Sequence, residues 1–193
     1  MENNAVTNIL LVGVGGQGII VASEIMADAF LEAGHDVKKS EVHGMAQRGG
    51  SVSTHIRFGS KVFSPLIKEG ETDILVAFEE LEAMRYLHYL GPEPAIILNE
   101  QRLNPPSVSL GKERYPENIA EVLSRKAARF KKVAGKDLAL KAGDIRTLNI
   151  VLLGALSSFL PVPEGIWTEN ILRRFPAKAH KANLEAFQLG RKA

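Results

Sequence analysis

Residues 41–51 (EVHGMAQRGGS) combine side chains that could hold or protonate a small anionic molecule with a backbone that bends easily. His43 can carry a proton near neutral pH, and the guanidinium of Arg48 can hold a carboxylate or a phosphate through two hydrogen bonds. The stretch predicts His43 and Arg48 as candidate catalytic residues, and Gln47, Arg48, Gly49 and Gly50 as residues that bind a cofactor. Plainer interpretations stay open: His43 as a polar loop residue, and Arg48 as a group that bonds loop carbonyls and holds the turn.

The glycine motif in residues 13–18 (GVGGQG) is the second stretch that could do chemistry. It follows an apolar run and precedes a helical pattern, where glycines permit a tight turn and a close approach of the backbone to a phosphate. The motif predicts cofactor-binding residues Gly13, Gly15, Gly16, Gln17 and Gly18. The alternative is a turn that only ties the first strand to its helix. No metal site is predicted on this chain.

A full dinucleotide site would also need an acidic residue about twenty residues further on, at the end of the second strand, to hold the ribose hydroxyls. Glu41 is the only good candidate, because Asp36 precedes that strand. Glu41 runs directly into His43 and Arg48 rather than into a quiet loop. The pattern therefore leaves NAD open without favouring it.

The elements that would position these residues are strands and helices in alternation. Apolar runs and alternating patterns predict strands over residues 8–14, 36–42, 51–58, 73–78 and 95–99, the third with one wetter face. Helical spacing predicts helices over residues 19–33 and 79–90, the second stopped by Gly91 and Pro92. The predicted fold class is α/β, with a Rossmann-like, mostly parallel sheet, flanking helices and a helical C-terminal segment.

Beyond Pro105 and Pro106 the pattern is helical, over residues 116–128, 137–141, 148–160, 163–175 and 178–192. We expect one α/β domain over residues 1–193, with a Rossmann-like sheet portion in 1–104 and a mainly helical portion in 105–193 that packs on it. The helical portion is the expected subunit interface. The basic stretch 125–136 (RKAARFKKVAGK) is expected to be a solvated helix end, with a docking surface as the alternative.

Composition limits the partners. The chain has 193 residues, of which 45% are hydrophobic and 24% charged, and its net charge of +2 is too small to indicate a nucleic-acid partner. Cysteine is absent, which excludes disulfides and thiolate ligands for iron–sulfur clusters on this chain. Without a signal-peptide pattern or an apolar run long enough to span a bilayer, the sequence predicts a cytoplasmic protein with no membrane partner.

Two stretches taken together resemble a known family. Residues 13–19 (GVGGQGI) and 41–52 (EVHGMAQRGGSV) are similar to the gamma subunit or domain of 2-oxoacid:ferredoxin oxidoreductases, and within that family to the small (beta) subunits of indolepyruvate ferredoxin oxidoreductases. The resemblance continues through residues 64–67, 149–155 and 183–190, so it covers nearly the whole chain.

This resemblance implies a complex that decarboxylates a 2-oxoacid on thiamine diphosphate with magnesium, passes electrons through [4Fe-4S] clusters to ferredoxin, and releases an acyl-CoA. It implies that these cofactors lie mostly on partner subunits, that coenzyme A approaches near this chain, and that the chain alone is inactive. Indolepyruvate or another arylpyruvate is the implied oxoacid.

Two alternatives remain beside this hypothesis. One is a free-standing NAD(P)-dependent oxidoreductase that uses the glycine motif and Glu41. The other is a non-catalytic scaffold subunit that binds a nucleotide or a phosphate.

Overall fold

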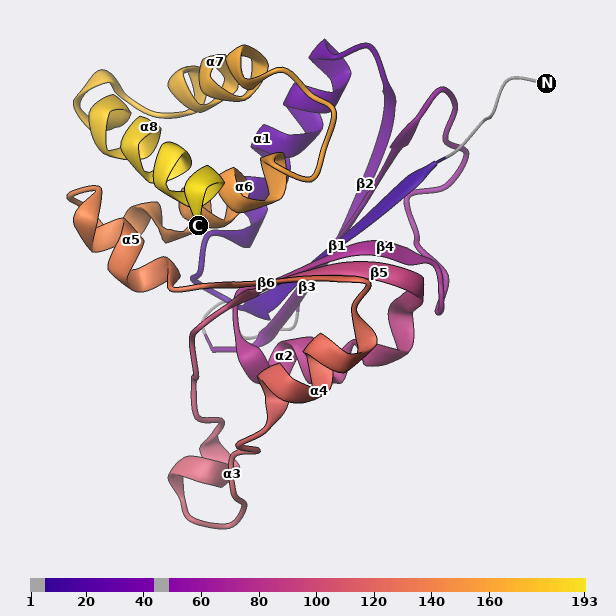
Figure 1. The fold of residues 1–193 in the computed structure, drawn as a ribbon, viewed down its shortest axis with the longest axis vertical. Helices are drawn as coiled ribbons and strands as arrows, with labels where there is room; N and C mark the ends of the chain where they lie inside the picture. The colour runs from indigo at the N-terminus through magenta and orange to yellow at the C-terminus, as the bar shows by residue number, and fades with distance from the viewer. Residues whose placement is uncertain (1–5, 44–48) are drawn as a thin grey trace.

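The structure is a computed structural model that describes residues 6–43 and 49–193. In this part of the chain, six strands form one sheet in the order β2-β3-β1-β4-β5-β6 (Figure 1). The strands are β1 (Thr7–Val14), β2 (Asp36–His43), β3 (Ser51–Gly59), β4 (Thr72–Ala77), β5 (Leu90–Asn99) and β6 (Arg129–Val133). The helices are α1 (Ile19–Glu32), α2 (Glu80–Arg85), α3 (Pro106–Ser109), α4 (Ile119–Lys126), α5 (Gly135–Lys141), α6 (Leu148–Ser157), α7 (Glu164–Arg174) and α8 (Ala177–Lys192), with 3-10 turns η1 (Leu87–Tyr89) and η2 (Ile145–Thr147).

The predicted α/β class is confirmed, and the sheet is mostly parallel. β1, β4, β5 and β6 pair in parallel, whereas β3 lies antiparallel between β1 and β2. Because β3 runs opposite to its neighbours, it starts at the edge of the sheet where β1 and β2 end. Gly49 and Gly50, just before β3, therefore lie beside the glycine motif.

Helices cover both faces of the sheet (Figure 1), which explains the continuous apolar run of β1. Ile9 and Leu11 belong to the core shared with α1, α6, α7 and α8. Leu10 and Val12 belong to the second core, on the face covered by α2 and α4. None of the helices within the described residues is long and apolar enough to cross a membrane.

The expectation of a wetter face on the third strand holds only at the ends of that face. Ser51 is exposed and Arg57 is half-buried, whereas Ser53 and His55 between them are at most 4% exposed. His55 Nδ1 accepts a hydrogen bond from the N–H of Ile67, 3.2 Å away, so the loop after β3 folds over this face.

Two further expectations need correction. The basic stretch is not a helix end: α4 stops at Lys126, and residues 129–133 form the edge strand β6, parallel to β5. β6 was missed because only Phe130 and Val133 carry its apolar pattern, one toward each core. The helix expected over residues 79–90 ends at Arg85, and β5 already begins at Leu90.

The helices α6 and α8 touch backbone to backbone. A Cβ built on Gly154 would overlap the carbonyl oxygen of Phe187, and one built on Gly190 would overlap the carbonyl oxygen of Val151. Each helix thus presents a glycine to the other, and no larger side chain fits unless the helices separate. This contact fixes α8 over the first core.

We predict that Gly190→Ala destabilises the chain by at least about 2 kcal/mol, because overpacking at the contact with Val151 outweighs the better helix propensity of alanine. Urea unfolding measures the change. The matched control is Gly165→Ala in α7, where a Cβ would meet nothing within 4 Å. The control is expected to be neutral or to stabilise by up to about 1 kcal/mol, and equal effects of the two substitutions would contradict the contact.

Candidate functional site

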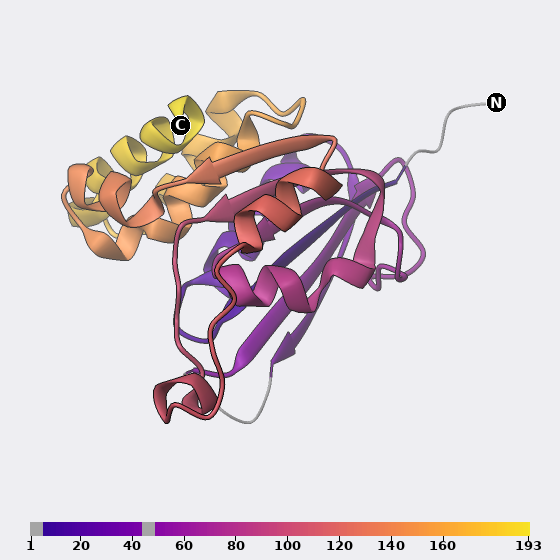
Figure 2. The ribbon, with the colours of Figure 1, turned by 60° about the horizontal axis from the view of Figure 1, so that its bottom comes forward.

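The glycine motif and the described ends of the polar stretch lie at the carboxyl edge of the parallel strands. The glycine motif follows β1, and Gly49 and Gly50 precede β3 at the same edge. Figure 2 shows the loops after β1, β4 and β5 on this side of the sheet. Open α/β sheets bind their ligands at this edge, where neighbouring strands connect in opposite directions.

Backbone hydrogen bonds join the two stretches directly. The N–H of Gly15 donates to the carbonyl of Gly50 at 2.8 Å, and the N–H of Gly49 donates to the carbonyl of Gly15 at 3.3 Å. Gly49 has a φ of 80°, in the left-handed region that favours glycine. Gly49 and Gly50, the described glycines of the polar stretch, therefore lie against the glycine loop.

Gln17 fastens the glycine loop to the ends of three strands. Its Oε1 accepts from the N–H of Val14 at 2.7 Å, and its Nε2 donates to the carbonyl of Phe78 at 2.9 Å and to Oε1 of Gln101 at 3.0 Å. A Cβ on Gly13 would lie 2.6 Å from Oε1 of Gln17, so this arrangement needs glycine there. The contacts give Gln17 a positioning role, and its binding of a cofactor stays a prediction.

The amino end of α1 is open. Gly18 is its N-cap with a φ of 77°, and no side chain caps the helix. Within the described residues, the N–H groups of Gly16 and Gly18 make no recorded hydrogen bond. These groups and the partial positive charge of the helix end suit an oxyanion.

Two hollows flank this loop. One, of about 400 Å³, is lined by aliphatic side chains and glycine backbone: Val14, Gly15, Gly16, Gly18, Ile19, Ile20, Val21 and Val52. The other, of about 450 Å³, is polar and is lined by Gly16, Gln17, Gly18, Gln101, Lys136, Ile145, Arg146 and Leu148. The loop thus offers an apolar wall on one side and two cations on the other.

The sequence did not indicate these cations, because Lys136 and Arg146 lie far from the motif along the chain. The side chain of Arg146 bonds Asp144, with Nη2 2.6 Å from Oδ2. Lys136 has no recorded partner among the described residues, and it is exposed. Only the arrangement of α5 and η2 beside the glycine loop brings them together.

Asn149 of α6 contacts the last residue of the glycine motif. Its Nδ2 donates to the carbonyl of Gly18 at 3.2 Å, and a Cβ on Gly18 would lie 2.8 Å from that nitrogen. Its Oδ1 is buried with no recorded partner. Asn149, Ser23 and Asn183 are buried polar groups on their helices, as helix-packing residues would be.

The geometry disfavours the dinucleotide alternative. Glu41 lies on β2, and β3 separates β2 from β1, so Glu41 is two strand spacings, roughly 10 Å, from the strand that carries the glycine motif. Its carboxylate is also paired with Lys39, at 2.6 Å. A ribose held at the glycine loop would not meet this carboxylate.

Three predicted site residues of the polar stretch lie at the border of the described residues or outside them. The backbone of His43 ends β2, in register with Val52 of β3. Gln47 and Arg48 lie outside the described residues. The predicted roles of His43, Gln47 and Arg48 stay predictions.

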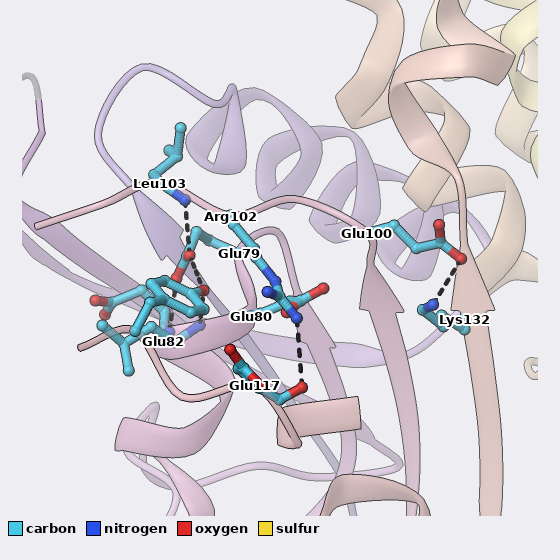
Figure 3. A network of polar contacts seen from close by, with 10 residues as sticks. Glu79, Glu80, Glu82, Glu100, Arg102, Leu103, Glu117 and Lys132 are labelled. Atoms are coloured by element: carbon cyan, nitrogen blue, oxygen red, sulfur yellow. Dashed lines mark hydrogen bonds and ion pairs between the residues drawn. The ribbon is translucent and has the colours of Figure 1, made fainter. Parts of the chain in front are cut away.

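Buried carboxylates lie beside this surface, at the start of α2 (Figure 3). Glu79 caps the helix: one oxygen accepts from the N–H of Glu82 at 2.9 Å, and the other accepts from the N–H of Leu103 at 3.0 Å and from the hydroxyl of Tyr115 at 2.6 Å. Burial and this bond to Glu79 raise the pKa of Tyr115. Glu80 accepts from Nε of Arg102 at 2.9 Å.

Glu82 connects this network to the polar stretch. Its Oε2 accepts a short hydrogen bond of 2.5 Å from the hydroxyl of Ser51, the first residue of β3, and its Oε1 lies 3.0 Å from Nε of Arg85. Burial raises the pKa of Glu82, although the bonds from Ser51 and Arg85 act in the opposite direction. Within the described residues no group of His, Cys, Asp and Glu could hold a metal ion, so we interpret the network as a support that positions Ser51.

Glu82→Gln tests this burial through the pH dependence of stability. Because the folded chain holds the Glu82 pKa above its unfolded value, about 4.3, ionisation costs wild-type stability as the pH rises through the folded pKa. We expect the stability of Glu82→Gln relative to wild type to rise as the pH rises above the unfolded pKa, and to level off once Glu82 is ionised in the folded chain, as measured by urea unfolding. Glu93→Gln, at an exposed site of β5, gives the baseline for removing one charge. A rise no larger than that baseline would contradict the assignment.

The chain is similar to known proteins over nearly its whole length. The profile of the pyruvate ferredoxin/flavodoxin oxidoreductase family matches residues 8–193. The indolepyruvate oxidoreductase subunit IorB of Archaeoglobus fulgidus is 41% identical over 187 residues, 95% of this chain and 92% of that protein. The pyruvate oxidoreductase subunit PORC of Thermotoga maritima has a TM-score of 0.73 at 23% identity, over 97% of this chain and 96% of that one. The 2-oxoglutarate:ferredoxin oxidoreductase of Magnetococcus marinus, solved with coenzyme A, has a TM-score of 0.75 at 22% identity, over 97% of this chain and 30% of that one.

Proposed function

The chain belongs to the pyruvate ferredoxin/flavodoxin oxidoreductase family, and from this membership we propose that it is the non-cluster subunit of a thiamine-diphosphate-dependent 2-oxoacid:ferredoxin oxidoreductase. The observation that carries the proposal is the 41% identity to an indolepyruvate oxidoreductase subunit over nearly the full length of both chains. The oxoacid proposed is therefore indolepyruvate or another arylpyruvate. The proposed compartment is the cytoplasm.

The absence of cysteine indicates which subunits would hold the cofactors. The chain has no cysteine, so the thiolate ligands of [4Fe-4S] clusters would come from partner subunits. We assign thiamine diphosphate and its magnesium to those partners as well, with ferredoxin as the electron acceptor of the whole complex. When bound there, the thiamine supplies an electron sink for decarboxylation, while protein groups supply orientation and electrostatics.

The surface around the glycine loop fits a role toward coenzyme A. Coenzyme A carries phosphates and a long, less polar arm, and the loop combines an open helix end, two nearby cations and an aliphatic hollow. In this proposal Gly16 and Gly18 lie against the phosphates through their backbone N–H groups, and Gly15 holds the loop through its bonds to Gly49 and Gly50. Arg48 with Gln47, Gly49 and Gly50 holds an anionic group of a substrate, and His43 carries a proton near it.

Reconstitution tests the function. We expect the purified chain to be folded but inactive toward any 2-oxoacid, and to restore acyl-CoA formation and ferredoxin reduction when it is mixed with its thiamine- and cluster-binding subunit. A thermal shift of the chain with coenzyme A, NAD and NADP is the companion measurement. Turnover by the chain alone, or saturable stabilisation only by a nicotinamide dinucleotide, would overturn the proposal.

The contribution of the polar stretch is tested in the reconstituted complex. Arg48→Ala is expected to lower the rate of acyl-CoA formation or the affinity for coenzyme A by about tenfold or more, because a charge-assisted bond to an anion is lost. Assembly of the complex should stay intact, as gel filtration would measure. Arg114→Ala, at an exposed arginine between α3 and α4, is the matched control. Equal rates for both variants would favour the scaffold alternative, in which the chain only assembles the complex.

A further inference from the structure

Three cations gather at the free edge of the sheet, on the face covered by the C-terminal helices. We call Arg129 and Lys131 of β6 and Arg191 of α8 the edge cluster. The guanidinium carbon of Arg129 lies 4.1 Å from the ring centroid of Phe159, and Nζ of Lys131 lies 5.7 Å from the same centroid. Arg191 donates to the hydroxyl of Ser157 at 2.8 Å.

The strand pattern explains this arrangement. Successive side chains of a strand alternate between its faces, so Arg129 and Lys131 lie on one face and Lys132 on the other. Lys132 is paired with Glu100 at 3.1 Å, as Figure 3 shows. β6 is an outer strand of the sheet and pairs only with β5 within the described residues, so the edge cluster borders backbone that is free to meet another chain (Figure 2).

The charges of the edge cluster are only partly balanced. Arg191 lies 3.3 Å from Glu164, but neither Arg129 nor Lys131 has a carboxylate partner recorded among the described residues. Burial lowers the pKa of Lys131, and the positive charges of Arg129 and Arg191 lower it further. The free chain therefore holds an unfavourable concentration of positive charge at this edge.

Part of this charge has a structural explanation. The cluster lies at the carboxyl end of α6, whose partial negative charge favours nearby cations, and Nζ of Lys131 lies 3.4 Å from the hydroxyl of Ser158 just beyond that helix. A helix-capping role and a binding role of these cations predict different effects of neutralisation on the stability of the free chain. Neutralising a capping cation destabilises the free chain, whereas neutralising a repelled, unpaired cation does not.

We propose that the edge cluster is a docking surface for a carboxylate-bearing segment of the thiamine- and cluster-binding subunit, an inference that rests on the proposed function. Charge complementarity selects an acidic occupant. A protein segment fits better than a small anion, because the cluster is spread over β6 and α8 and contributes to none of the hollows at the glycine loop. A strand edge also offers backbone groups that an extended segment can use.

The test compares two double variants of the full chain. In one, Arg129→Gln and Lys131→Gln neutralise the cluster on β6. In the control, Lys178→Gln and Lys181→Gln remove the same charge from exposed positions in the first turns of α8. The dissociation constant for the partner subunit is measured from low to high salt, and the melting temperature of each free chain is measured alongside.

We expect the cluster variant to bind its partner at least about tenfold more weakly at low salt, with a flatter salt dependence than the control, because screened charge pairs are lost. Its melting temperature as a free chain should change little, because relief of the repulsion among Arg129, Lys131 and Arg191 offsets the lost contact between Arg129 and Phe159. Equal dissociation constants and salt slopes for the two variants would overturn the docking surface, and so would a lower melting temperature with unaltered binding, which marks a capping role.

Pyrophosphate that stabilises only the wild-type chain while partner binding is unaltered would also overturn the docking surface, in favour of a site for a small anion. If the wild-type chain does not bind the partner at all, the proposed function fails first.

Discussion

The candidate site depends on the reversed direction of β3. Since β3 enters the sheet where β1 and β2 leave it, Gly49 and Gly50 at its start lie beside the glycine loop, and both form backbone hydrogen bonds with Gly15. Were β2 paired directly with β1, as in a dinucleotide-binding sheet, an acidic residue would stand in that position. In this topology no acidic residue stands where a ribose would bind, and the surface at the glycine loop is lined by backbone groups and flanked by Lys136 and Arg146.

Support for this surface comes from polar side chains with specific partners, of which Asn149 and Glu82 are buried and Gln17 is half-buried. Gln17 holds the ends of β1, β4 and β5, Asn149 holds Gly18 from α6, and Glu82 holds Ser51 from α2. Buried polar groups are costly unless they are bonded, so each of them specifies one position of the loop it contacts. Together these bonds hold the glycine loop and the start of β3 in one position, as a site made of backbone N–H groups requires.

Local patterns predicted the elements that have a strong period or an apolar run. β1 and α6 were predictable because nearly all of their residues are buried, and α1 because its buried residues recur at helical spacing along one face. β6 was not, because a five-residue strand with three basic residues carries too few apolar positions to show a period. The burial of β3 was missed for a different reason: Ser53 and His55 are covered by elements distant in sequence, and local polarity cannot reveal that. The glycine motif and the 41–51 stretch indicated the candidate surface, and their binding roles stay predictions, whereas Lys136, Arg146 and Tyr115 come near it only through tertiary contacts.

The backbone contact between α6 and α8 has a consequence for synthesis of the chain. Most residues of α6 are buried, and α8, which covers one side of it, is synthesised after it. Until α8 has been made, the apolar side of α6 stays uncovered, so the first core is completed only when this helix folds onto it. A chain that lost its final helix through premature termination would expose that surface permanently and become a substrate for chaperones and proteases.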